Sequence, residues 1–350
     1  MSTKERSFSI NQKKIWLLID SLTYGGIEAH VLQLAKGLKK YRVAVQVVFI
    51  AHYSTPTPLE EQLRISSIPY FFSNISFPSS NEFKSLRLAI KFTKPSLIHT
   101  HGYKANLYGR IIRCLSPTMR IKQISTYHAG ETSKGKIWLY DFLDRYSSNL
   151  SNTCLAVSQS IQNKLPSSSY LLHNFISFDN ITKSQGDEIA FVGRLSYEKG
   201  PDKLVKIAKY FPKEYFHCYG EGPMKKKILI DKPRNLILHG YQKDMNHVWK
   251  NIGILIICSR YEGMPMVALE AMARGIPVCA VNVGELPVLI QSSYNGFLAT
   301  NDRELVNGIQ KWITLSKTRK MFIRQKAIET IQKNYSVNNI IPKLLQIYQN

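Results

Sequence analysis

The chain has 350 residues, of which 44% are hydrophobic and 11% aromatic, which is enough for two globular domains with full cores. No apolar run reaches the length of a membrane span, and the apolar run at 15–19 is too short for a signal-peptide core, so secretion is not expected. The five cysteines are scattered without a CxxC pair. This pattern favours free thiols in a reducing cytoplasm and offers no zinc-binding spacing.

The formal net charge of +23 is the strongest compositional signal. Such a charge suits nucleic acid, the anionic inner face of a membrane or a phosphorylated substrate, and a solvated basic surface is the plain alternative. No nucleic-acid-binding motif accompanies the charge, so contact with a membrane surface is favoured. Basic residues cluster on two expected helices, at Lys36, Lys39, Lys40, Arg42, Lys84, Arg87, Lys91 and Lys94.

Strands and helices alternate through the first half. The strand at 14–20 is followed by a loop with Gly25 and Gly26 and by an amphipathic helix at 27–39. This geometry lets backbone amides approach a phosphate, although the GxGxxG fingerprint of dinucleotide-binding folds is absent. Further strands are expected at 43–50, 69–72, 95–101, 122–127, 153–157 and 170–176, with helices at 59–66, 80–92, 104–114 and 136–150.

Two histidines end the strand at 95–101. His99 and His101 are two positions apart and therefore share one face of the strand. A metal-binding pair is one interpretation, but the sequence offers no evident third ligand. A hydrogen-bonded structural histidine at a strand end is the alternative.

A polar segment at 177–188 separates the halves and reads as a linker. The second half restarts with a buried strand at 189–193 and a loop that carries Arg194 and Lys199. Two cations in such a loop can neutralise a leaving diphosphate where no metal does so. An ordinary ion pair with Glu198 in the same loop is the alternative.

The most informative stretch is SRYEGMPMVALEAMARGIPV at 259–278, which contains a turn at Gly263 and a helix that begins at Pro265. Glu262 lies just outside the helix N-terminus, and Glu270 lies within the helix. Free N–H groups at a helix N-terminus bind anions. The two carboxylates are then available to the hydroxyls of a sugar or ribose. Otherwise Glu262 merely complements the helix dipole and Glu270 is solvated.

Five motifs carry a family resemblance. E-G-M-P-x-V-x-L-E-A-M-A-x-G-x-P-V resembles the E-x7-E element of retaining GT-B glycosyltransferases of family 4, also called glycosyl transferases group 1. G-R-L-x-x-E-K-G, G-G-x-E, H-x-H-G and S-T-Y-H-A-G resemble other elements of that family. The resemblance implies an α/β protein of the GT-B class, with two Rossmann-like βαβ domains facing a central cleft. We expect an acceptor-side domain at 1–176, a linker at 177–188, a donor-binding domain at 189–335 and a C-terminal helix at 336–350 that crosses back.

The resemblance also implies roles for individual residues. Glu262 would contact the donor sugar, Glu270 the ribose, and His128 the acceptor side of the cleft. The catalytic residues implied are Glu262, His101, Arg194 and Lys199. The donor-binding residues implied are Gly25, Gly26, Arg194, Lys199, Tyr241, Glu262, Gly263, Met264, Pro265, Met266, Val267 and Glu270.

The function implied is retaining, metal-independent transfer of a hexose from a nucleotide-diphosphate donor, expected to be a UDP-sugar, without a cofactor. The acceptor would be a hydroxyl of a glycan or a lipid-linked molecule in bacterial surface polysaccharide or lipopolysaccharide assembly. With the basic surface, this predicts a cytoplasmic enzyme at the inner face of the membrane, with no nucleic-acid partner. The rival hypothesis is a basic α/β nucleic-acid-binding protein without transferase activity. A nicotinamide dehydrogenase would need the missing glycine fingerprint.

Overall fold

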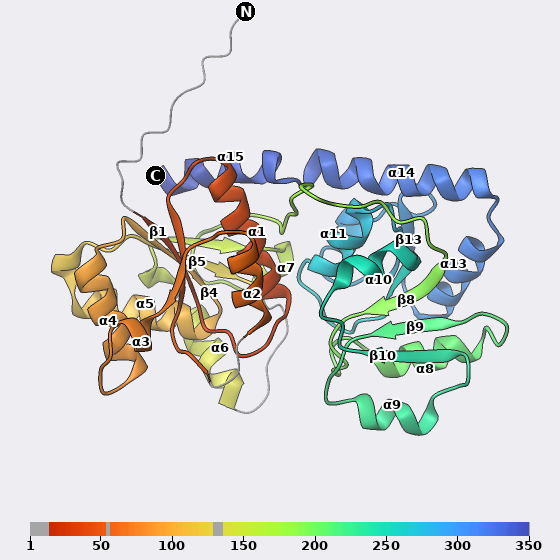
Figure 1. Ribbon diagram of the computed structural model, residues 1–350, viewed down its shortest axis with the longest axis horizontal. Coiled ribbons are helices and arrows are strands. Elements are labelled where there is room, and N and C mark those ends of the chain that lie inside the picture. The colour runs from red at the N-terminus through yellow and green to blue at the C-terminus, as the bar shows by residue number, and fades with distance from the viewer. Residues whose placement is uncertain (1–13, 54–56, 129–135, 350) are drawn as a thin grey trace, which may run out of the picture.

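The structure is a computed structural model, and it describes residues 14–53, 57–128 and 136–349. Two parallel sheets, each flanked by helices, form the two halves of the molecule (Figure 1). This is the GT-B architecture expected from the sequence.

The first sheet has seven strands in the order β3-β2-β1-β4-β5-β6-β7. Its strands are β1 (Ile15–Ile19), β2 (Val45–Phe49), β3 (Tyr70–Phe72), β4 (Leu97–His101), β5 (Gln123–Tyr127), β6 (Thr153–Ala156) and β7 (Ser169–Leu171). The helices that accompany it are α1 (Gly26–Lys40), α2 (Pro58–Ile65), α3 (Ser73–Ser76), α4 (Glu82–Thr93), α5 (Tyr103–Leu115), α6 (Lys136–Tyr146) and α7 (Gln159–Gln162), with short 3-10 turns η1 (Pro117–Met119) and η2 (Ser148–Leu150).

The second sheet has six strands in the order β10-β9-β8-β11-β12-β13. Its strands are β8 (Glu188–Val192), β9 (Phe216–Tyr219), β10 (Leu236–Gly240), β11 (Ile252–Ile257), β12 (Val278–Val281) and β13 (Gly296–Ala299). The helices of the second half are α8 (Pro201–Lys209), α9 (Lys225–Asp231), α10 (Met245–Asn251), α11 (Met266–Ala273), α12 (Leu286–Leu289), α13 (Asp302–Thr314), α14 (Lys317–Asn334) and α15 (Val337–Gln349).

The central strands form because they are apolar on both faces. Every residue of β1 and of β11 is buried, as parallel strands covered by helices on both sides require. Helix starts are fixed by polar caps: Asn81, Asn301 and Ser316 each accept a hydrogen bond from a backbone amide three residues on. Buried apolar strands and capped helix starts together account for the alternation of strands and helices along the chain.

The last helix packs on the first half. α14 and α15 follow each other along one edge of the molecule, and α15 reaches the N-terminal sheet (Figure 1). Ile341, Leu344 and Leu345 of α15 are buried in the same core cluster as α1 and β1. The chain therefore crosses between its halves twice, and the crossings pair: Ile176 N donates to Tyr335 O at 3.0 Å, and Val337 N donates to Ile176 O at 3.2 Å.

Three local expectations were wrong. The helix expected at 136–150 ends at Tyr146, and Ser148–Leu150 forms the 3-10 turn η2 instead. The strand expected at 170–176 ends at Leu171, because the chain leaves the sheet there to form the crossing at Ile176. Pro265 is the N-cap of α11 and not its first helical residue, with φ −71° and ψ 121°. The extended ψ of this proline places the Glu262 turn outside the helix.

Candidate active site

The strand order reverses at the same point in both sheets. β1 and β4 are neighbours in the first sheet, and β8 and β11 are neighbours in the second. In doubly wound sheets, ligands bind at the carboxyl ends of the strands flanking such a switch point. The loops after these four strands carry most of the residues singled out from the sequence.

Glu262 lies in the loop between β11 and α11, and it is paired with Lys199. The Lys199 Nζ is 2.7 Å from Glu262 Oε1 and 2.8 Å from Oε2. The Ser259 hydroxyl also donates to Glu262 Oε1, at 2.7 Å. The side chain of Glu262 is 7% exposed and that of Lys199 is 29% exposed, so this charge-assisted contact is sheltered from bulk water. The carboxylate is therefore held in one orientation, with a cation beside it.

The alternative ion pair within the 194–200 loop does not form. Glu198 accepts a hydrogen bond from the Ser196 hydroxyl instead, and its backbone carbonyl accepts from the Arg260 amide at 2.7 Å. Arg194 is exposed and has no ion pair among the described residues. Its side chain is thus exposed to solvent, while Lys199 contacts Glu262.

A second loop supports the Glu262 turn. Gly284 has φ +57°, and a Cβ at this position would lie 2.3 Å from the carbonyl oxygen of Gly263. The amide of Glu285 donates to that same Gly263 oxygen at 2.8 Å. Glycine is required at 284 because the two backbones touch there.

Hydrogen bonds join the C-terminal half to the first half around this turn. Asn174 Nδ2 donates to the Met264 carbonyl at 2.7 Å. Glu285 Oε1 accepts from the Gln159 amide at 2.6 Å, and Glu285 Oε2 lies 3.4 Å from His173 Nε2. Sequence reasoning missed Asn174 and Glu285. The only available signal was a glycine and a glutamate directly after a buried strand, which resembles many ordinary turns.

Glu270 and Tyr24 approach each other from opposite halves. Burial raises the pKa of Glu270, and the positive charge of Arg274 partly offsets this. Burial, followed by the charge of Glu270, raises the pKa of Tyr24 as well, and Tyr241 contributes. Tyr241 itself is 55% exposed. Tyr24 of the first half is thus close enough to Glu270 and Tyr241 of the second for their charges to act on it. The sequence does not indicate this proximity, since Tyr24 carries no motif of its own.

The glycine loop after β1 is only partly open. The amide of Gly25 donates to Glu28 Oε2 at 2.9 Å and is therefore occupied by the capping glutamate. A Cβ at Gly26 would meet nothing within 4 Å, so the chain is open to a ligand at that position. Burial raises the pKa of Glu28, which lies in the first turn of α1.

Three histidines form a cluster in the first half, next to the Glu262 turn. His101 is buried, and its Nδ1 lies 3.1 Å from Nε2 of His128. His30 of α1 packs against His128, with ring centroids 4.7 Å apart. Burial lowers the pKa of His30 to about 4 and holds the pKa values of His101 and His128 well below the usual 6.5. All three imidazoles are therefore neutral at physiological pH.

His99 has a different role from the one its spacing indicated. Its Nδ1 lies 2.6 Å from the Tyr348 hydroxyl of α15, and its Nε2 lies 2.6 Å from the Thr126 hydroxyl. Both ring nitrogens are satisfied within the core. His99 and His101 do share one face of β4, with ring centroids 4.4 Å apart, as strand alternation predicted. Because both nitrogens of His99 are occupied, the ring nitrogen that His101 contacts is that of His128.

The remaining predicted residues surround the Glu262 turn. A Cβ at Gly263 would lie 2.9 Å from the His128 carbonyl oxygen, so the turn touches the first half directly. The side chains of Met264, Pro265 and Met266 are buried, and Val267 is half-buried. Because these side chains are turned into the protein, the groups that the start of α11 offers to a ligand are its first backbone amides.

Two family models match the chain. The model described as "Glycosyltransferase Family 4" matches residues 24–168, and the model described as "Glycosyl transferases group 1" matches residues 174–328. An uncharacterized glycosyltransferase of Methanocaldococcus jannaschii is 27% identical over 355 residues, covering 91% of this chain and 97% of that protein.

Two further similar proteins have names that include a substrate or a bound ligand. The UDP-Gal:alpha-D-GlcNAc-diphosphoundecaprenol alpha-1,3-galactosyltransferase of Escherichia coli is 22% identical over 277 residues, covering 69% of this chain and 72% of that protein. The crystal structure of Anabaena HepE in complex with UDP-glucose superposes with a TM-score of 0.81 at 18% identity, covering 96% of this chain and 99% of that chain. With the motifs and the two switch points already described, the chain belongs to the GT-B glycosyltransferases of family 4, which use nucleotide-sugar donors.

Proposed function

We propose that this glycosyltransferase moves a hexose from a UDP-sugar to a hydroxyl of a lipid-linked acceptor during surface polysaccharide assembly. The observation that carries the proposal is the sheltered Glu262–Lys199 pair at the start of α11. The E. coli relative, whose name includes UDP-Gal and a diphosphoundecaprenol acceptor, supports the choice of donor and acceptor class. HepE, solved with UDP-glucose, supports the choice of nucleotide.

The leaving group in this proposal is the nucleoside diphosphate. Lys199 and the exposed Arg194 neutralise the charge that develops on it, and the free amides of the first turn of α11 add partial positive charge. Because Lys199 already contacts Glu262, the diphosphate and the sugar would be held by one connected set of side chains. No metal ion is assigned a role in these steps.

The sugar and ribose bind to carboxylates. Glu262 accepts hydrogen bonds from sugar hydroxyls near the anomeric carbon, and Glu270 accepts them from the ribose. The acceptor oxygen attacks the anomeric carbon on the face from which the diphosphate leaves. The bond from that carbon to the phosphate oxygen breaks, and this oxygen takes the acceptor's proton, so configuration is retained. Neutral His101 and His128 offer hydrogen bonds to the sugar and to the acceptor.

The acceptor side of the proposal rests on an exposed apolar face, which we call the α6 surface. The side chains that form it are Trp138, Leu139, Tyr140, Phe142, Leu143 and Tyr146. Aromatic rings contact one another along it: Trp138 stacks on Phe142 with centroids 5.5 Å apart, and Tyr146 lies tilted against Phe142 with centroids 4.2 Å apart. Aromatic side chains exposed on one helix suit the interface of a bilayer.

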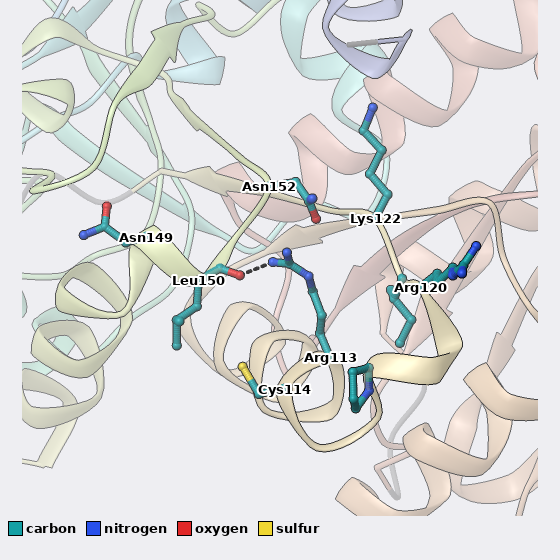
Figure 2. A pocket seen from close by; sticks show the side chains of 9 residues that line it. Arg113, Cys114, Arg120, Lys122, Asn149, Leu150 and Asn152 are labelled. Carbon is teal, nitrogen blue, oxygen red and sulfur yellow. Dashed lines mark hydrogen bonds between the residues drawn. The ribbon is translucent and has the colours of Figure 1, made fainter.

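A basic hollow of about 620 Å³ is lined in part by Asn149 and Leu150 of η2, the turn that follows α6 in the chain. Figure 2 shows the side chains that line it, including Arg113, Arg120 and Lys122, and the hydrogen bond from Arg113 to the Leu150 carbonyl. Cations and interfacial aromatics together fit an anionic membrane surface. None of the described helices is long and apolar enough to cross a membrane.

The test is release of nucleoside diphosphate from a panel of nucleotide sugars, with a membrane lipid extract as the source of acceptor. Wild type is compared with Glu262→Ala and with the control Glu329→Ala, which removes an exposed carboxylate on α14. Release from a UDP-sugar that only Glu262→Ala abolishes would support the proposal. Absence of UDP binding, or release that survives in Glu262→Ala, would overturn it.

A further inference from the structure

Three histidines from three elements converge in the cleft. His30 lies in α1, His101 ends β4, and His128 follows β5. One ring nitrogen of each lies within 4.8 Å of the other two. We call these three residues the histidine triad. They are far apart in the sequence and meet only because the fold brings α1 and the ends of β4 and β5 together.

The ring nitrogens of the histidine triad are not all satisfied. His30 Nδ1 and His101 Nε2 are buried and have no hydrogen-bond partner. These two residues are 2% and 1% exposed. Buried polar atoms are nearly always paired, and the neighbouring His99 shows the usual arrangement with a partner on each nitrogen. Two orphaned nitrogens in one cluster indicate a ligand that accepts lone pairs.

The nitrogen ligands of three imidazoles favour transition-metal ions over Mg²⁺ and Ca²⁺. Neutral imidazole suits Zn²⁺, Co²⁺, Ni²⁺ and Cu²⁺, whereas Mg²⁺ and Ca²⁺ prefer oxygen ligands. A site with three protein ligands keeps its fourth coordination position open. The Glu262 turn lies next to the histidine triad, since the His128 carbonyl oxygen is 2.9 Å from where a Cβ of Gly263 would be.

We propose that the histidine triad binds one divalent transition-metal ion and that an ion bound there inhibits sugar transfer. The inhibitory part rests on the proposed function, in which His101 lies beside the donor sugar. An ion held by His101 and its neighbours would take up that space and remove the hydrogen bonds that the two imidazoles offer. The ion is thus a competitor of the donor and not part of the transfer itself.

Metal binding is tested without sugar transfer. Untagged protein is titrated with Co²⁺, and the visible absorption of tetrahedral Co²⁺ is followed until Zn²⁺ displaces it. We expect one ion per chain. Loss of an outer-shell partner alone weakens metal sites by about 10- to 100-fold, so removal of a ligand in His128→Asn or His30→Asn is expected to weaken binding by about 100-fold or more. His128 is half-buried, which makes His128→Asn the variant that best tolerates substitution.

The matched control is His217→Asn with His239→Asn, which removes a second pair of touching histidines, 3.0 Å apart, in the C-terminal half. This control is expected to keep the Co²⁺ spectrum. A wild type without the spectrum, a spectrum that survives in both triad variants, or one that disappears in the control would overturn the site.

Inhibition is tested with nucleotide-sugar turnover. Zn²⁺ is expected to raise the apparent KM for the donor, and EDTA is expected to restore it. Co²⁺ binding with a transfer rate unchanged by saturating Zn²⁺ would overturn the inhibitory role. Co²⁺ binding in a protein that transfers no sugar, with or without EDTA, would support the metal site and overturn the proposed function, so the two failures are distinguishable.

Discussion

At the scale of single residues, the site depends on charges that are sheltered and paired. Lys199 is held by both oxygens of Glu262, at 2.7 and 2.8 Å. In the proposed mechanism this lysine both fixes the carboxylate and supplies positive charge to the departing diphosphate. Replacing it should therefore affect the transition state more than the fold.

For Lys199→Met we expect kcat/KM for the donor to fall by about 10²- to 10³-fold, the usual effect of losing one preorganised group that stabilises developing charge. Steady-state release of nucleoside diphosphate measures this. Lys206→Met, an exposed position on α8, is the control and should behave as wild type. A Lys199→Met variant with more than half the wild-type kcat/KM would contradict the role.

Glu270→Gln tests the raised pKa of Glu270. Ribose hydroxyls bind best to the ionised carboxylate, and burial places its pKa above the usual 4.5. The Kd of wild type for UDP should therefore rise as pH falls through that raised pKa. Glu270→Gln should bind UDP more weakly at pH ~7.5, with less dependence on pH. Calorimetry at several pH values measures both proteins, and UDP's own titration cancels in the comparison. Parallel profiles would rule out a contribution from Glu270.

Gly284→Ala tests the contact between two backbones. The φ of +57° and a Cβ 2.3 Å from the Gly263 oxygen would force the Glu262 turn to move. We expect a loss of about 1–3 kcal/mol in the free energy of unfolding and a lower kcat. The control for stability is Gly102→Ala, which has φ +88° but no atom within 4 Å of its Cβ. Equal losses in urea unfolding would mean that the close approach adds nothing.

Local motifs singled out some residues of the candidate site and not others. Glu262 and Lys199 each lie in a short local pattern, and the structure brings them together. Tyr24, Asn174 and Glu285 were not singled out, because each acts across the two halves, and contact between distant segments leaves no local signal. The third histidine was missed for the same reason, since His30 lies in a helix and meets His101 only through packing.

At the scale of elements, α15 links the two ends of the chain. Its buried face shares a core with α1, where a Cβ on Gly37 would lie 2.8 Å from Ile341. Its last turn places the Tyr348 hydroxyl on His99, which belongs to β4, the strand that ends in His101. A helix near the C-terminus thus sets the position of a strand that carries a site residue.

Ile341→Ala should destabilise the N-terminal half by about 2–5 kcal/mol, as truncation of a fully buried aliphatic side chain usually does. Gln346→Ala, on the exposed face of the same helix, is the control and should stay within about 0.5 kcal/mol of wild type. Urea unfolding followed by circular dichroism measures both. Equal effects would mean that α15 does not contribute to that core.

The elements themselves follow from the sequence with few exceptions. Buried parallel strands such as β1 and β11 are continuous apolar runs, and alternating units predicted both sheets. The exceptions lie where tertiary contacts override local pattern. β7 is short because the chain must leave the sheet at Leu171 to cross to the other half. α3, with four residues, has no periodicity to detect.

At the scale of the whole molecule, the net charge of +23 bears on where the enzyme works. The α6 surface and the basic hollow lie on the N-terminal half, the half proposed to meet the acceptor. Long-range attraction to an anionic membrane would concentrate the enzyme near a lipid-linked substrate, and salt would weaken that attraction.

We expect the protein to sediment with vesicles that contain anionic lipid, at low salt, and not with neutral vesicles. Trp138→Ala with Tyr146→Ala should reduce the bound fraction because it removes exposed aromatics from the α6 surface. The control Lys225→Ala, Lys226→Ala and Lys227→Ala removes three charges from α9 in the other half and should have a smaller effect. A larger loss in the control would mean that charge alone, wherever it lies, governs binding.

The paired crossings near Ile176 and Ser336 have a mechanical consequence. A single connecting strand would let the halves bend and also twist about it. Two connections that exchange backbone hydrogen bonds act together as a two-stranded hinge. Such a hinge allows the halves to bend toward each other but resists the twisting of one half against the other. Opening of the cleft should therefore follow one path, and each closure would return Glu262 to the same place opposite His128.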